Sequence, residues 1–220
     1  MKFLDENLVE WLKRPELSEL RAAFSVNLIS KNSFVCQADS TDNTIFIVTR
    51  GRARVYLGYE EKEFNLAILA TGDLYSTHTG AYVQAMEELE ILITDAPTFL
   101  QHMARNAEIN LAMIKVLGNV LKSSFSIIDG LVFKDATCRL LSLLLTEAKR
   151  QQPQHDGTVV LQIDLSVEQI ARMVGSSRQT VSTQLNRLIR SKLLHRQGRG
   201  AFVIPDITAL ETYYSTADCL

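Results

Sequence analysis

Short apolar and β-branched runs, separated by turns rich in Gly, Asp or Asn, fill the chain from Phe34 to Thr94. Evenly spaced runs of this kind are typical of a β-barrel or jelly roll. We therefore expect a jelly-roll domain over residues 1–108. The predicted strands are Thr44–Thr49, Ala53–Tyr59, Phe64–Leu69, Tyr82–Ala85 and Leu89–Thr94.

Two short amphipathic helices follow one another between Leu165 and Ile189. Gly175 allows a tight turn between them, and Ser166 with Gln169 and Ser176 with Gln179 have the spacing of capping boxes. The arrangement is typical of a helix-turn-helix, and the alternative is an ordinary solvated helix pair. Apolar residues recur at helical spacing in each segment: Val167, Ile170, Ala171 and Val174, then Val181, Leu185 and Leu188.

Polar side chains cover the face of the second helix opposite Val181 and Leu185. In a helix-turn-helix the first residues of this helix meet base edges, where Arg can bridge the two acceptors of guanine and Gln can pair with adenine. We assign these base contacts to Arg178 and Gln179. The other expected DNA-contacting residues are Ser176, Ser177, Ser182, Thr183, Arg187 and Arg199.

The segments around these helices complete a winged helix. Leu193–Gln197 and Ala201–Ile204 predict two strands around the turn Gly198-Arg199-Gly200, and Pro205 ends the hairpin. A helix over Ala136–Lys149 and a strand over Val159–Ile163 are expected before the helix-turn-helix. Residues 135–220 are therefore expected to form a winged-helix DNA-binding domain.

A long helix is expected between these domains, at residues 109–134. Its apolar positions step by three and four residues, which is typical of a coiled-coil seam, although a helix packed on its own domain would give a similar pattern. A two-fold dimer would read two half-sites of double-stranded DNA, so we expect a homodimer. Phe133-Lys134-Asp135 is expected to be a hinge. The seam positions are Ile114, Leu117, Leu121, Ser124, Ile128 and Leu131.

Charge supports the DNA-binding prediction. The net charge of -2 conceals seven basic and two acidic residues within positions 161–204. A basic charge concentrated on one module is what phosphate contacts require.

The three cysteines, Cys36, Cys138 and Cys219, are widely spaced without a CxxC motif. This argues against a disulfide framework or a zinc site and favours the reducing cytoplasm, and we expect Cys36 to be a small buried residue. We expect no apolar run long enough to span a bilayer and therefore no association with a membrane.

Barrel, long helix and winged helix together resemble the Crp/Fnr superfamily of bacterial regulators over nearly the full chain. The resemblance implies an α+β fold, a palindromic operator, a contact with RNA polymerase and a role as a transcription activator. Cyclic nucleotides are disfavoured as the effector, because a buried cyclic phosphate needs a cation, normally Arg. No Arg lies between Arg54 and Arg105, and the segment Gly72–Ala85 lacks the Arg-Ser pair of the family's phosphate cassette.

The segment Arg54–Glu87, which contains GDLYSTHTGAYVQA, resembles the haem-containing carbon monoxide sensors of this superfamily. The resemblance continues through Lys115–Asp135 and Ser176–Ile189. It implies that haem b is bound and that His78 is the ferrous axial ligand, with Asn43 hydrogen-bonded to the other ring nitrogen. Without the resemblance, His78 would be interpreted as a hydrogen-bonded barrel residue.

The resemblance also implies the surroundings of the haem. The second axial ligand would be the N-terminal amine of Met1, supplied across the dimer and displaced by carbon monoxide. Ser76 stands where a cysteine binds ferric haem in the family, and an alcohol is a poor iron ligand. The residues that would pack on bound carbon monoxide are Leu117, Gly118 and Leu121.

Two other functions remain open. A regulator with the same DNA module could respond without haem to nitric oxide, a redox signal or another small molecule. A catalytic barrel fused to a DNA module would need converging His, Cys or carboxylate motifs, and residues 1–100 contain one His. We therefore expect no enzyme. His102, His155 and His195 are expected at the surface of a helix, a loop and the wing.

Overall fold

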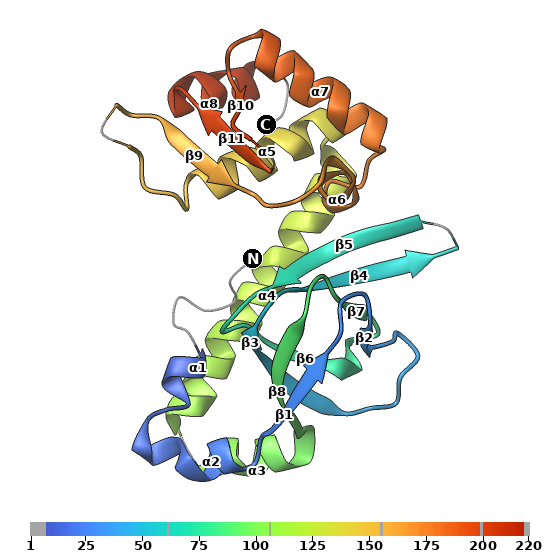
Figure 1. Ribbon diagram of the computed structural model, residues 1–220, viewed down its shortest axis with the longest axis vertical. Coiled ribbons are helices and arrows are strands. Elements are labelled where there is room, and N and C mark those ends of the chain that lie inside the picture. Colours follow the sequence, from blue (N-terminus) through green and yellow to red (C-terminus); the bar gives the residue numbers. More distant parts are fainter. Residues whose placement is uncertain (1–7, 61, 106, 155, 199, 218–220) are drawn as a thin grey trace. The chain divides into compact units, whose positions relative to one another are not determined.

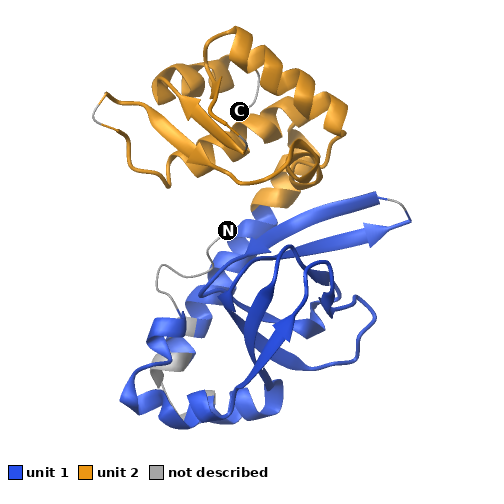
Figure 2. Ribbon diagram, in the orientation of Figure 1, with its two compact units in different colours: residues 1–125 blue, residues 126–220 orange. Residues whose placement is uncertain are grey.

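A computed structural model describes residues 8–60, 62–105, 107–154, 156–198 and 200–217 (Figure 1). The chain divides into two compact units, residues 1–125 and 126–220 (Figure 2).

The first unit contains two four-stranded antiparallel sheets, with strand orders β1-β8-β3-β6 and β2-β7-β4-β5 among the described residues. This confirms the jelly-roll architecture and the α+β class, and the predicted strands are recovered as β3, β4, β5, β7 and β8. The strands are β1 (Ser25–Ile29), β2 (Phe34–Cys36), β3 (Thr44–Arg50), β4 (Ala53–Tyr59), β5 (Lys62–Leu69), β6 (Leu74–Ser76), β7 (Tyr82–Ala85) and β8 (Leu89–Asp95).

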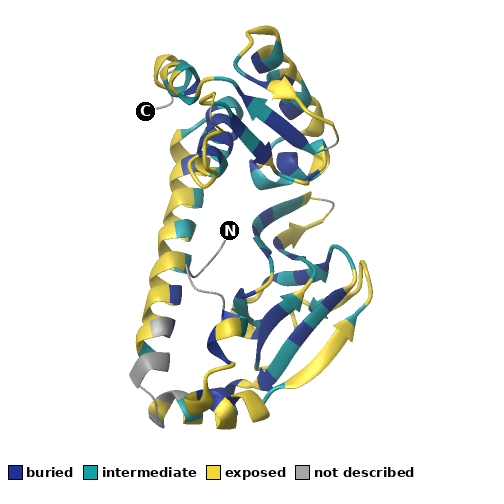
Figure 3. Ribbon diagram, turned by 60° about the vertical axis from the view of Figure 1, so that its left-hand side comes forward, coloured by how far each residue is buried: buried dark blue, intermediate teal, exposed yellow. Residues whose placement is uncertain are grey.

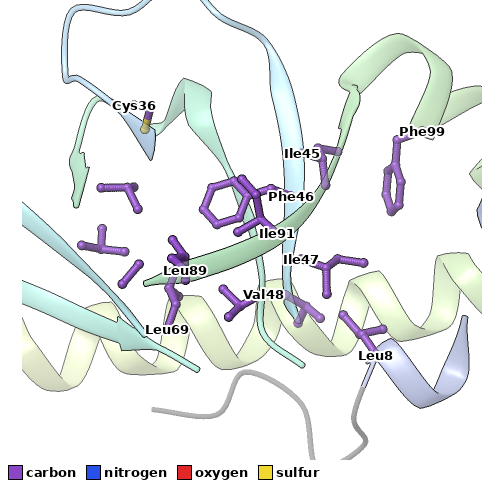
Figure 4. Close-up of a cluster of buried hydrophobic side chains, with 14 of the residues drawn as sticks. Leu8, Cys36, Ile45, Phe46, Ile47, Val48, Leu69, Leu89, Ile91 and Phe99 are labelled. Carbon is purple, nitrogen blue, oxygen red and sulfur yellow. The ribbon is translucent and has the colours of Figure 1, made fainter. Parts of the chain in front are cut away.

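The core of this unit lies around β3, where Ile45 to Val48 are all buried (Figure 4). A strand normally buries alternate residues, but β3 also contacts helices α1 (Leu8–Trp11) and α3 (Ala96–Arg105). These helices bury its second row of side chains. The short elements η1 (Pro15–Leu17) and α2 (Ser18–Ala22) lie between α1 and β1 and add Leu17 and Leu20 to the same core.

The long helix is α4 (Ala107–Phe133), and it has two different apolar faces. Met113 and Val116 are buried against the core of the first unit. The predicted seam is exposed instead: Ile114 at 65%, Leu117 at 67%, Leu121 and Ile128 at 54%, and Leu131 at 46% (Figure 3).

An apolar surface of this extent also affects the membrane prediction. Met113–Phe133 is long and apolar enough to cross a membrane by length and composition. The expectation that no run has this length is therefore wrong. The helix is this apolar because one of its faces packs on the core of the first unit and a second apolar face is exposed.

The second unit is a winged helix built around Leu140, Leu144, Leu161 and Ile170. The strands form an antiparallel sheet of order β10-β11-β9. At Phe133-Lys134-Asp135, where a hinge is predicted, the helix is interrupted: α4 ends at Phe133 and the Asp135 carboxylate caps α5 by accepting from Cys138 N at 2.7 Å. The elements are α5 (Ala136–Ala148), β9 (Val159–Gln162), α6 (Val167–Met173), α7 (Arg178–Arg190), β10 (His195–Arg196), β11 (Ala201–Ile204) and α8 (Ile207–Thr216).

The cysteines meet the expectation only in part. Cys36 is buried and free, as expected, and burial raises the pKa of its thiol. Cys138 is disulfide-bonded, which the wide spacing of the three cysteines did not predict. Spacing along the chain does not report which side chains the fold brings together.

Candidate DNA interface and effector site

Both helices of the helix-turn-helix are closed by side-chain and backbone caps. The box at the start of α6 is confirmed, because Gln169 N donates to Ser166 Oγ at 3.2 Å and Ser166 N donates to Gln169 Oε1 at 2.8 Å. The cap of α7 is Ser177, whose Oγ accepts from Thr180 N at 3.0 Å.

The predicted cap Ser176 with Gln179 is therefore wrong by one residue. Gly175 has a φ of +59°, and Ser176 N donates to Ala171 O at 3.0 Å. This 6→1 bond after a left-handed residue closes the C-terminus of α6 in a Schellman motif. Ser176 thus belongs to the end of the first helix, and the next residue starts the second.

The face of α7 expected to read DNA is exposed, while Val181, Leu185 and Leu188 on the other side are buried. Arg178, Gln179 and Arg187 make no side-chain hydrogen bond or ion pair with other described residues, so these groups are available to a ligand. Ser177 and Thr183 are exposed, Ser176 and Ser182 are half-buried, and Arg199 lies outside the described residues.

In the first unit, His78 is exposed on the one-turn helix η2 (Thr77–Thr79), which connects β6 to β7. The buried Thr77 holds this turn against the start of β3. Its hydroxyl donates to Asp42 O at 2.6 Å and accepts from Thr44 N at 3.0 Å. The position of His78 is thus determined by the sheet rather than by a free loop.

Ser76 is hydrogen-bonded to the imidazole of His78, with Oγ at 2.6 Å from Nδ1. The same Oγ donates to Thr44 O at 3.3 Å. With the ring proton on Nδ1, the hydroxyl accepts from His78 and donates to Thr44, so that every donor has an acceptor. Nε2 then keeps its lone pair and is the atom that a metal would bind.

The other residues expected at this site lie apart from that pair or outside the described residues. Asn43 is exposed; its backbone oxygen accepts from Ala96 N at 2.9 Å, and among the described residues its side chain makes no hydrogen bond to His78. Leu117, Gly118 and Leu121 form a separate group on the exposed face of α4, where a Cβ built on Gly118 would meet no atom within 4 Å. Met1 lies outside the described residues.

Among residues 8–60, 62–105, 107–154, 156–198 and 200–217, no group of three or more His, Cys, Asp or Glu side chains could hold a metal ion. This donor set does not suit zinc, which takes three or four protein ligands. A porphyrin supplies four nitrogens itself and needs only axial ligands from the protein. One exposed imidazole therefore suits haem iron better than a bare metal ion.

Comparison with known proteins gives consistent results. A family model described as the Crp-like helix-turn-helix domain matches residues 138–213. A doubly substituted CooA from Carboxydothermus hydrogenoformans is 39% identical with a TM-score of 0.92, covering 96% of this chain and 97% of that chain.

Two further relatives differ in their effectors. The reduced CO-sensing protein from R. rubrum is 34% identical with a TM-score of 0.54, covering 94% of this chain and 98% of that chain. The cAMP-activated global transcriptional regulator CRP of Salmonella typhimurium is 26% identical over 181 residues, which is 77% of this chain and 84% of the relative.

Proposed function

The chain belongs to the Crp/Fnr superfamily of DNA-binding transcription regulators, and on that premise we propose that it is a haem-dependent carbon monoxide sensor that activates transcription as a homodimer. The observation that carries the proposal is the Ser76–His78 pair, which leaves Nε2 of an exposed imidazole available when the ring proton is on Nδ1. The chain is similar to CooA of Carboxydothermus hydrogenoformans over 97% of that chain. That protein is described as a CO-dependent transcription factor, which supports carbon monoxide as the effector here.

His78 would hold haem b through Nε2, and bound haem would supply the carbon monoxide-binding chemistry. The hydrogen bond to Ser76 orients the ring, and with the proton on Nδ1 it is the support that imidazole ligands usually receive. We assign Asn43, Leu117, Gly118 and Leu121 to the surroundings of the haem and Met1 to the opposite axial position.

The output of the switch is the winged helix. Arg178 and Gln179 would read base edges of a palindromic operator, with Ser176, Ser177, Ser182, Thr183, Arg187 and Arg199 around them. We assign the exposed face of α4 to the dimer interface and not to a membrane. We also propose that the protein is cytoplasmic and contacts RNA polymerase.

Absorption spectra of the full chain test the proposal. After haem is added, dithionite and then carbon monoxide should shift the Soret band. His78→Ala should lose the reduced and carbon monoxide spectra, while His102→Ala, which removes a half-buried His of the same unit, should keep them. Trp11 is the sole Trp and is 7% exposed in the core of the first unit, so quenching of its fluorescence gives a second measure of haem binding.

The same proteins should then be tested for operator binding by fluorescence anisotropy, with carbon monoxide, nitric oxide and cAMP added separately. Failure to retain haem, or an unchanged carbon monoxide response in His78→Ala, would refute the proposal. A response to cAMP alone would favour a Crp-type effector, although no Arg lies between Arg54 and Arg105 to neutralise its phosphate.

A further inference from the structure

The guanidinium of Arg139, in the first turn of α5, bonds to carbonyl oxygens from three separate segments of the second unit. Nη1 donates to Lys134 O at 2.6 Å and to Gly130 O at 3.4 Å. Nε donates to Val174 O at 2.6 Å, and Nη2 donates to Gly175 O at 3.2 Å. These acceptors lie at the end of α4, in the segment after it, and in the turn of the helix-turn-helix.

The chemistry of these acceptors explains why a guanidinium is required. The last carbonyls of a helix have no partner within it, and the helix dipole makes that end negative. Arg139 meets two such ends. Val174 is the C-cap of α6, and Gly130, whose carbonyl also accepts from Lys134 N at 3.2 Å, lies in the last turn of α4. Five N–H groups in a rigid planar fork can serve both ends at once, which the ammonium group of Lys cannot do with the same geometry.

A second contact holds the same segment. Lys134 Nζ donates to Tyr214 OH in α8 at 3.0 Å and lies 3.5 Å from Asp129 Oδ2. The residues expected to form a hinge therefore make contacts on both sides, to α5 through Arg139 and to α8 through Tyr214. The second compact unit begins at Ser126, so the end of α4 belongs to the same unit as the winged helix (Figure 2).

We propose that Arg139 is a positioning residue that makes the end of α4 and the helix-turn-helix move as one body, so that a displacement of α4 reaches α7. The inference rests on the proposed function only for the origin of the displacement.

Operator binding of the haem-loaded full chain, measured with and without carbon monoxide, tests the coupling. In Arg139→Gln the ratio of the two affinities should fall by about fivefold or more, the lower end of usual allosteric coupling. Arg139→Lys, which keeps the charge, should recover part of the affinity ratio lost in Arg139→Gln. Arg150→Gln is the matched control, because Arg150 bonds to Glu147 beside the other end of α5. A preserved ratio in Arg139→Gln, or an equal loss of both affinities, would overturn the proposal.

Hydrogen exchange of the free protein gives a measurement that does not depend on the effector. Lys134 N donates to Gly130 O and Ser176 N to Ala171 O, so these amides report on the two ends of the contact. Arg139→Gln should accelerate exchange at both by about tenfold, as expected for loss of charged hydrogen bonds, with Leu161 in the core unchanged. Acceleration at neither amide, at one alone, or throughout the unit overturns the proposal, even where carbon monoxide itself proves not to be the effector.

Discussion

Truncation of Ile128 tests whether the exposed apolar face of α4 is a dimer interface. Ile128 is 54% exposed in one protomer. Full burial of an Ile side chain contributes about 1.5–3 kcal/mol, so burial of the exposed half contributes about 0.8–1.5 kcal/mol. A two-fold axis doubles this to about 1.6–3 kcal/mol, which corresponds to a roughly ten- to hundredfold higher dimer Kd in Ile128→Ala.

Sedimentation velocity over a concentration series measures this dimer Kd. Phe133→Ala is the matched control, because Phe133 is 77% exposed and lies on the side of α4 opposite the seam. It should leave the dimer Kd unchanged. The reasoning is refuted if Ile128→Ala stays within about twofold of the unmodified chain, far below the loss expected from buried area, or if Phe133→Ala has the larger effect.

Three further variants test the individual sites. Ser76→Ala should weaken haem binding about 10–100-fold, because the His78 ring loses its Nδ1 partner; competition with apomyoglobin measures this, and unchanged affinity would show that the hydroxyl has no supporting role. Arg178→Ala should cost about 1–3 kcal/mol of discrimination between the operator and a single-base variant in anisotropy titrations, whereas equal weakening on all sequences would make it a phosphate contact. Ser177→Ala should lower the free energy of unfolding in urea by about 1 kcal/mol through loss of the α7 cap, and a larger loss in Ser176→Ala would contradict the assigned cap.

The strands that could be predicted are those with a clear apolar pattern. β1 was missed because four of its five residues are exposed, so burial leaves no alternation along it. β2 and β6 have three residues each, which is too short for any period to show. These three strands pair with strands distant in the sequence, as β1 does with β8 and β6 with β3.

The candidate site shows the same division. The cap at Ser166 follows from a local spacing and was predicted correctly. Whether Ser176 or Ser177 caps α7 depends on where α6 ends, which the spacing does not report. Arg139 carried no sequence signal, since any exposed helix can hold an Arg. Its role is visible only when the carbonyls of Gly130 and Val174 lie on either side of it.

The sequence by itself determined the helix-turn-helix, the wing and the long helix with its second apolar face, because each is encoded by the spacing of neighbouring residues. Only the tertiary structure decided that Ser76 engages Nδ1 of His78, on a turn held by Thr77 against β3. Only the tertiary structure brought one guanidinium between two helix ends. The physical reason is that hydrogen bonds depend on the direction and distance of individual atoms, whereas periodicity reports only which side of an element is buried.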